Sequence, residues 1–239
     1  MKNQRLFKLY SSFLEGVIKI NAIIDVFPIL MKGIDITITV LVLSVIFGYL
    51  FAFIAGLCRL SNNRLISGLT TFYVEIFRGT SLIVQLFWLY YAIPMLFDLS
   101  IDNQLFAGVL AISLNYGAYM SEIVRGSILA VDKGQSEASI ALNLSRFQRM
   151  RLIIFPQAVR MMLPEFGNYL IQMLKATSLV SLIGMTDILY HGNILRSTDL
   201  SQAPTVYLLL LIFYFIMALP LIFLTRKGEQ ISKRGVARL

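Results

Sequence analysis

Long stretches without a single charged residue restrict the fold of this chain more than any other feature. The stretches that lack Asp, Glu, Lys and Arg are 36–58, 79–97, 103–121 and 200–225. A fifth, 166–186, is interrupted only by Lys175. A bilayer core about 30 Å thick requires roughly 20 apolar residues as helix, and each stretch is about that long. Because these stretches lack the alternation of barrel strands, they predict an all-α integral membrane protein with about five transmembrane helices.

The composition agrees with this fold class. Of the 239 residues, 57% are hydrophobic and 14% are charged, whereas about a quarter of the residues in soluble domains are charged. We expect an N-terminal interfacial amphipathic segment at 1–32, a transmembrane domain at 33–227 and a tail at 228–239. The predicted spans are 36–58, 79–97, 103–124, 164–186 and 203–225, and a long polar loop occupies 130–160.

The distribution of Lys and Arg predicts the orientation. These residues gather between the first two spans, in the 130–160 loop and after the last span, while the other two loops carry only Arg196. Short loops rich in Lys and Arg stay in the cytoplasm. We therefore expect the N-terminus outside and the C-terminus in the cytoplasm, although five basic residues before the first span argue against it. The same pattern accounts for the net charge of +8, so no nucleic-acid partner is expected.

No arrangement of residues typical of an enzyme is present in the sequence. The single histidine, His191, has no cluster of metal ligands around it, so no metal site is predicted. No nucleophile stands in a pattern with a base. The phosphate-binding motif Gly-x-x-x-x-Gly-Lys-Ser/Thr is also missing, so the chain is not expected to hydrolyse ATP.

The polar loop contains two helix-start signals. Asp132 with Gln135 and Ser145 with Gln148 are spaced as in capping boxes. Asn143, between them, can adopt the left-handed conformation that ends a helix. The loop therefore predicts two short helices with a bend between them, docked on the cytoplasmic face.

The second helix is expected to stop or kink at Pro156. Two interpretations of this helix pair remain open. In one, the pair only covers the ends of the spans. In the other it is a knob that binds another protein. Small side chains such as Ala138 and Ala141 would let a partner approach closely, and Glu137 would offer it a charge.

The same loop resembles the cytoplasmic loop of ATP-binding-cassette (ABC) importer permeases. That loop reads Glu-Ala-Ala, three residues, Gly, nine residues, Ile, one residue and Leu-Pro. The matching positions here are Glu137, Ala138, Ser139, Asn143, Ile153, Phe155 and Pro156, of which four are identical. The motifs FYVEIFRGTSLIVQLFWLYYAIP, YGAYMSEIVRGSILAVDKGQSEAS, PQAVRMMLPEFGNYL and MLKATSLVSLIG are similar to the branch that takes up polar amino acids. Ser81, where that branch usually has Pro, and the motif LKATSLVSLIGMTDI look closest to permeases for ectoine and hydroxyectoine.

The resemblance covers the chain from about Gly33 to the tail and implies a type I ABC importer permease in the bacterial cytoplasmic (inner) membrane. It implies four kinds of partner: two ATPase subunits that bind ATP and Mg, a second permease that is a homologue rather than a copy, an extracytoplasmic solute-binding protein, and the bilayer. No cofactor is expected in this chain. The solute would be a polar amino acid or a similar compatible solute. The residues expected to couple to the ATPase are Gly134, Gln135, Glu137, Ala138, Ser139, Ala141, Leu142 and Asn143.

Polar residues inside the spans are candidates for the translocation path. They are Lys175, Thr177, Ser178, Gln85, Trp88, Asn115 and Tyr119. A charge such as Lys175 in a span normally faces the bundle interior or a wet cavity, although snorkelling to the interface is the alternative. Gln85, Asn115 and Tyr119 could equally form hydrogen bonds between helices.

Two acid–base pairs have a spacing of three residues, Glu75 with Arg78 and Glu122 with Arg125. This spacing places each pair on one helix face, so we expect local ion pairs, with gating contacts to the other subunit as the alternative. The rival to an ABC permease is a secondary transporter driven by an ion gradient, which would also place a charge near the membrane midplane.

Overall fold

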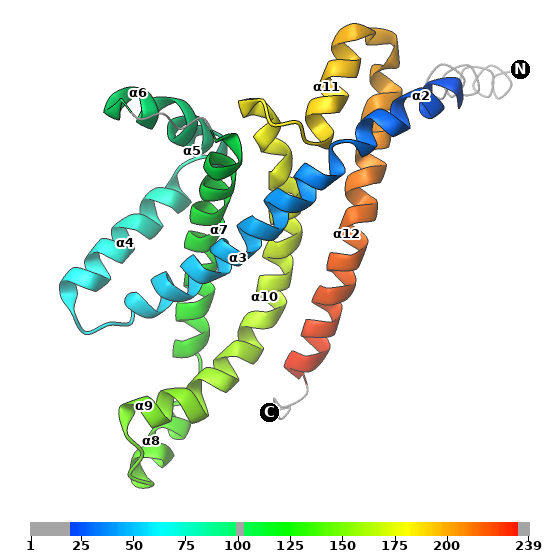
Figure 1. The fold of residues 1–239 in the computed structure, drawn as a ribbon. Coiled ribbons are helices and arrows are strands. Elements are labelled where there is room, and N and C mark those ends of the chain that lie inside the picture. Colours follow the sequence, from blue (N-terminus) through cyan, green and yellow to red (C-terminus); the bar gives the residue numbers. More distant parts are fainter. Residues whose placement is uncertain (1–19, 99–102, 234–239) are drawn as a thin grey trace, which may run out of the picture.

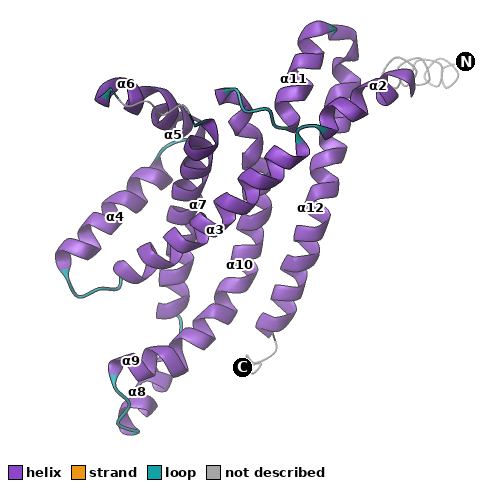
Figure 2. Cartoon of the chain, in the orientation of Figure 1, coloured by secondary structure: helices purple, strands orange, loops and turns teal. Residues whose placement is uncertain are grey.

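A computed structural model describes residues 20–98 and 103–233 of the chain. Within these ranges the secondary structure is helical and includes no strand, as Figure 2 shows. The predicted all-α fold class is therefore confirmed. Most of the predicted interfacial segment, 1–19, and the last part of the predicted tail, 234–239, lie outside the described residues.

Four long helices, α3, α7, α10 and α12, form the frame of the molecule (Figure 1). The full order is α2 (Ile20–Met31), α3 (Ile34–Cys58), α4 (Arg64–Gly79), α5 (Leu82–Phe87), the π-helical η1 (Trp88–Ala92), α6 (Ile93–Phe97), α7 (Gln104–Leu129), α8 (Lys133–Ala141), α9 (Arg146–Arg149), the π-helical η2 (Met150–Ile154), α10 (Phe155–Ala176), the 3-10 helix η3 (Thr177–Ile183), α11 (Ile188–Thr198), the 3-10 helix η4 (Leu200–Gln202) and α12 (Ala203–Lys233). In Figure 1, α6 and α11 lie at one end of the frame, while α8 and α9 lie at the other.

Among the described residues, two helical stretches are long and apolar enough to cross a membrane, α3 and Leu200–Gln230. The number rises to four if each of two bent helix pairs forms one span. These pairs are Arg64–Gly79 with Leu82–Phe97, bent by 110°, and Arg146–Ile183 with Ile188–Thr198, bent by 51°. Helix α7 has the length for a span, at 26 residues, but it is richer in polar residues. The boundaries of the spans in the bilayer stay a prediction.

Helix α7 is the core of the bundle, and this position explains its polar composition. Helices α3, α4, α5 and α10 all pack against it. Glycines allow α3 to approach it closely: a Cβ added to Gly56 would lie 2.6 Å from Cβ of Val124, and one added to Gly117 would lie 2.8 Å from Cβ of Phe51. Small residues have this role where membrane helices cross. Because α7 is enclosed by protein, its polar side chains find partners on its neighbours.

The predicted span at 79–97 is not a single straight helix. The chain bends by 110° between α4 and α5, where Thr80 and Ser81 have extended backbone angles. The π-helical turn η1 then separates α5 from α6. The preceding segment, which the sequence analysis assigned to a cytoplasmic loop, forms helix α4.

The second helix of the polar loop does not end at Pro156. Helices α9, η2 and α10 follow one another without a break from Arg146 to Ala176. Proline lacks an N–H and clashes with the carbonyl four residues earlier, and here the wider π-helical turn of η2 directly precedes Pro156. The expectation of two short helices is therefore wrong for the second, which is the beginning of a long helix. Helix α12 likewise continues beyond residue 227, into the predicted tail.

Candidate functional site

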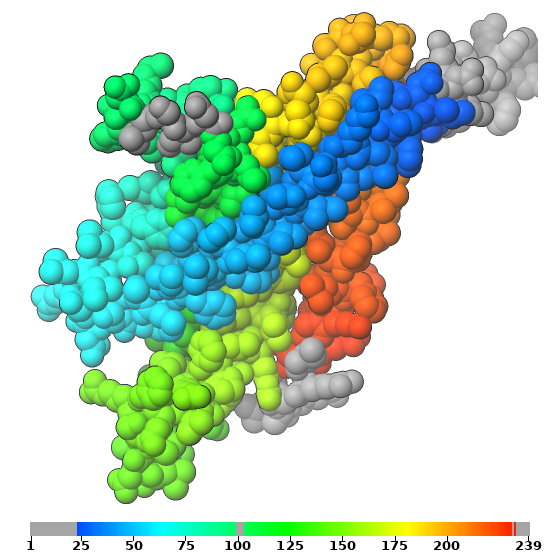
Figure 3. All heavy atoms as spheres, viewed as in Figure 1, coloured from blue at the N-terminus to red at the C-terminus, as the bar shows by residue number. Residues whose placement is uncertain are grey.

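The helix pair α8–α9, residues 132–149 and hereafter the knob, projects from one end of the bundle (Figure 3). Its local structure follows the signals in the sequence. The Asp132 side chain accepts a hydrogen bond from the Gly134 N–H, and Ser145 and Gln148 form a complete capping box. Asn143 has a φ of 55°, in the left-handed region. The two N-caps and the turn predicted for this loop are thus confirmed, although of the first capping box only the Asp132 cap is present.

The knob presents nearly all its predicted coupling residues to its surroundings. Gly134, Gln135, Glu137, Ala138, Ala141, Leu142 and Asn143 are exposed. Ser139 is the exception, because it is 1% exposed and donates a hydrogen bond to the Ser136 carbonyl at 2.6 Å. The apolar side chains of Leu142 and Phe147 are 72% and 71% exposed. Large exposed apolar side chains outside a membrane are typical of a surface that another protein covers.

A polar pocket lies where the break between α4 and α5 meets α7 and α10. Its volume is about 360 Å³, and its lining residues are Thr80, Ser81, Leu82, Asn115, Tyr116, Tyr119, Tyr169 and Gln172. Among the described residues that line it, none is charged. Of the predicted path residues, Asn115 and Tyr119 line this pocket.

Two buried amides explain why the chain can bend beside the pocket. The Gln85 Nε2 donates to the Phe77 carbonyl at 2.9 Å and to the Thr80 Oγ1 at 2.7 Å. The Asn115 Nδ2 donates to the same Phe77 carbonyl at 2.9 Å and to the Gln85 Oε1 at 3.0 Å. The last carbonyls of a helix have no hydrogen-bond partners within the helix. Here the two amides donate hydrogen bonds to the Phe77 carbonyl near the end of α4. Gln85 therefore forms hydrogen bonds between helices, while Asn115 does so and also lines the pocket.

Three tyrosines form much of the pocket wall. The Tyr116 hydroxyl donates to the Gln172 carbonyl at 3.3 Å, and the Tyr119 hydroxyl donates to the Arg78 carbonyl at 3.0 Å. Tyr169 stands across from both, on α10. Tyr116 was not predicted from the sequence, although its spacing of three residues from Tyr119 places both on one helix face. Tyr169 was not predicted either, because the sequence offers no comparable signal for it.

Helix α10 carries a polar face that is exposed in the single chain. Glu165, Asn168, Gln172 and Lys175 are all exposed, and their spacing places them on one side of the helix. Lys175 lies in the last helical turn and makes no ion pair among the described residues. This face continues into the pocket, because Gln172 belongs to both.

The other predicted path residues are not brought together. Thr177 is buried and donates to the Leu174 carbonyl at 2.7 Å. Ser178 donates to the Lys175 carbonyl at 2.8 Å. Trp88 is exposed in η1 and is not among the pocket-lining residues. Thr177 is therefore buried within the core of this chain.

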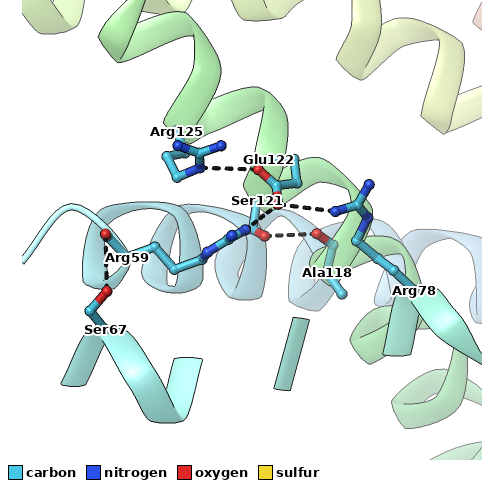
Figure 4. A network of polar contacts seen from close by, with 7 residues as sticks. All are labelled: Arg59, Ser67, Arg78, Ala118, Ser121, Glu122 and Arg125. Carbon is cyan, nitrogen blue, oxygen red and sulfur yellow. Dashed lines mark hydrogen bonds and ion pairs between the residues drawn. The ribbon is translucent and has the colours of Figure 1, made fainter. Parts of the chain in front are cut away.

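A network of ion pairs joins three helices beside the pocket (Figure 4). The Glu122 carboxylate on α7 pairs with Arg59 at the end of α3, with Arg78 of α4 at 3.0 Å and with Arg125 at 3.1 Å. The expected local pair of Glu122 with Arg125 is present. The expected ion pair of Glu75 with Arg78 is not formed, because the Arg78 side chain pairs with Glu122 on another helix. The network ties α3 and α4 to the central helix.

These features define a class of protein. A bundle of apolar helices carries a polar pocket that opens between α4–α5, α7 and α10, and such a pocket suits a small polar solute. The knob lies apart from that pocket and has an exposed surface with apolar side chains. The chain is thus built as the membrane-embedded permease subunit of a transporter.

The chain belongs to the family described as "Binding-protein-dependent transport system inner membrane component", whose sequence model matches residues 26–229. It is 46% identical over 203 residues to a probable amino-acid ABC transporter permease protein, y4tF, of Sinorhizobium fredii, covering 83% of this chain and 85% of that one. It is 36% identical over 214 residues to the glutamine transport system permease protein GlnP of Escherichia coli, covering 89% and 97%. The arginine transport system permease protein ArtQ of Bacillus subtilis is 35% identical over 210 residues, covering 88% and 95%.

Solved structures agree with this family. A chain of an amino acid ABC transporter crystallised with histidines superimposes with a TM-score of 0.81 at 33% identity, covering 89% of this chain and 98% of that one. A chain of the inward-facing methionine transporter MetNI superimposes with a TM-score of 0.66 at 19% identity, covering 84% and 96%, and shows the shared fold.

The predicted resemblance to ABC importer permeases is therefore confirmed, as is the type I permease fold. Permeases of this family are membrane subunits, and ATP is hydrolysed in a separate subunit. The alternative of a secondary transporter is excluded. An importer of this kind works with an ATPase and a solute-binding protein.

Proposed function

We propose that this chain forms one half of the path by which a polar amino acid, or an amino-acid-like compatible solute, crosses the membrane. The observation that carries the proposal is the polar pocket, which opens between α4–α5, α7 and α10 in an otherwise apolar bundle. Its uncharged hydrogen-bonding lining suits a small polar solute. The relatives named for glutamine and arginine transport support the amino-acid class.

The path is completed by a second permease subunit. The polar face of α10 carries Glu165 and Lys175, which are costly to expose to lipid. A second permease packed on this face would remove these charges from lipid and enclose the pocket, which shares Gln172 with the face. We propose that this second subunit is a homologue rather than a copy of the chain.

The knob couples the permease to its ATPase. Its exposed Ala138, Ala141 and Leu142 offer a close-fitting apolar surface, and Glu137 a charge. We propose that each permease subunit inserts its knob into a groove of one of two ATPase subunits, which bind ATP and Mg. Packed interfaces resist compression, so closure of the ATPases displaces the helices behind the knob. This arrangement requires the knob and the C-terminus in the cytoplasm and the N-terminus outside.

Co-purification tests the coupling. The affinity-tagged chain, expressed with its complete importer, should retain the ATPase, and Ala138→Trp should release it because the bulky ring cannot enter a close-fitting groove. The matched control is Ser201→Trp, at an exposed site between α11 and α12, which should retain the ATPase. Equal retention in both variants would contradict docking through the knob, and solute uptake without any ATPase would contradict the whole proposal.

Uptake assays identify the solute. Ser81, on which the resemblance to ectoine permeases partly rests, lines the pocket. We propose ectoine or hydroxyectoine as the narrower solute, with glutamine and arginine as the competing ones. Vesicles that contain the complete importer and its binding protein should accumulate radiolabelled ectoine in preference to either amino acid. Preference for an amino acid would refute ectoine as the solute but would agree with the broader proposal of a polar amino acid.

A further inference from the structure

The three tyrosines of the pocket form a group of aromatic faces contributed by two helices. The rings of Tyr116 and Tyr169 are 6.1 Å apart between centroids and meet edge to face. The rings of Tyr119 and Tyr169 are 6.2 Å apart and nearly parallel, with an interplanar angle of 27°. Because Tyr169 neighbours both α7 tyrosines, the three rings form one cluster in the wall of the pocket.

The two α7 rings are held in place before any solute arrives. The hydroxyls of Tyr116 and Tyr119 are both committed to backbone carbonyls, of Gln172 and Arg78. Fixing the groups of a site in advance reduces the entropy lost on binding. The hydroxyl of Tyr169 makes no hydrogen bond among the described residues, so both the ring and the hydroxyl of this lining residue are available to a solute.

The faces of these rings attract cations. A cation within about 6 Å of an aromatic centroid is stabilised by the ring quadrupole. The Arg78 guanidinium already lies 5.6 Å from the centroid of Tyr119, and its own charge is paired with Glu122. None of the described residues that line the pocket is an Asp or Glu. The aromatic faces can therefore stabilise a positive charge inside it, beside the neutral oxygens of the lining hydroxyl and amide groups.

We propose that Tyr116, Tyr119 and Tyr169 form a cage that binds the cationic nitrogen of the solute. The cage selects solutes that carry an ammonium or a delocalised nitrogen cation over otherwise similar carboxylates that lack one. This inference rests on the proposed function, because it assumes that the solute passes through the pocket. It adds the group that the solute must carry and the residues that recognise it.

Equilibrium binding to the complete importer in nanodiscs, without its solute-binding protein, tests the cage. The probes are L-glutamine, ectoine and glutaramate, which is glutamine without its ammonium group. Tyr169→Leu, which removes the ring, should weaken binding of the better cationic probe about tenfold. Tyr169→Phe, which keeps the ring, should stay within about twofold of the wild type. Tyr207→Leu, an exposed tyrosine of α12 outside the pocket, is the matched control and should have no effect.

The outcomes distinguish cation binding by the tyrosine rings from other roles of these residues. Unchanged binding in Tyr169→Leu, or equal losses in Tyr169→Leu and Tyr169→Phe, would overturn the cage. A loss of glutaramate binding as large as the loss for the cationic probe would also overturn it, because the ring would then act through packing alone. Retention of the ATPase by each variant shows that it is folded. Failure of the wild type to bind either cationic probe would instead contradict the proposed solute class, and the cage with it.

Discussion

Replacing Glu122 by Gln should destabilise the bundle more than any other single charge neutralisation among the described residues. Within the described part of the chain, Glu122 is the one carboxylate that pairs with Arg59, Arg78 and Arg125. Its side chain is 22% exposed and that of Arg59 is 11% exposed, so water screens the pairs only partly. Without the carboxylate, three guanidinium groups from three helices remain close together with no opposite charge. The repulsion acts between α3, α4 and α7, whose packing forms the core.

The magnitude follows from the burial of these groups. Breaking a buried pair by removing one partner costs about 3–5 kcal/mol. Gln retains one oxygen that can accept from an arginine, and the site is partly exposed, so we expect about 2–4 kcal/mol. At roughly 2–4 °C per kcal/mol for a chain of this size, the melting temperature should fall by about 5–15 °C.

Differential scanning fluorimetry of the complete importer in detergent measures this fall. Glu75→Gln is the matched control, because Glu75 is an exposed acid on α4 without an ion pair among the described residues. Its melting temperature should stay within about 1 °C of the wild type. The double variant Glu122→Gln with Arg78→Gln should recover part of the loss, because one unpaired cation is removed. A melting temperature of Glu122→Gln equal to that of Glu75→Gln would refute the reasoning.

Three further changes have expected outcomes, two of them in the same assay and the third in hydrogen exchange. Gly117→Leu should lower the melting temperature or prevent assembly, because its Cβ alone would lie 2.8 Å from Cβ of Phe51, whereas Gly126→Leu should be tolerated because nothing lies within 4 Å of its added Cβ. Gln85→Leu should cost about 1–3 kcal/mol, because it leaves polar groups at the α4–α5 break unpaired; an unchanged melting temperature would contradict this role. Ser145→Ala should lower the stability of α9 by about 1 kcal/mol, because it removes the N-cap of this helix. Hydrogen exchange should become faster at 145–149 only, and unchanged exchange there would contradict the role of the cap.

The features that the sequence predicted well depend on nearby residues. The capping box of Ser145 and Gln148 spans three residues, and the left-handed turn at Asn143 is set by that residue and its neighbours. The helical class follows from runs of apolar residues that satisfy their own backbone groups. Such signals are complete within a short segment, so they can be recognised without the fold.

The features that the sequence did not predict depend on contacts between distant segments. The partner of Arg78 was expected three residues away, at Glu75, but an arginine is long enough to reach Glu122 of a neighbouring helix. The bend at Thr80 is held by Asn115, 38 residues beyond the Phe77 carbonyl that it caps. Tyr169 joins the pocket only because α10 packs against α7. Periodicity and spacing within one helix carry no information on these pairings.

The continuous helix from α9 to α10 explains how two sites so far apart can belong to one mechanism. Its first residue, Arg146, lies in the knob, and Tyr169 and Gln172 line the pocket. Tyr169 lies 23 positions after Arg146, which corresponds to about 35 Å of helix. A rigid element of this length would carry a displacement of the knob to the wall of the pocket. The opposite wall belongs to α7, which the Glu122 network ties to α3 and α4. Movement of α10 against that fixed group would separate Tyr169 from Tyr116 and Tyr119, so docking at the knob would change the cage itself rather than only the route that leads to it.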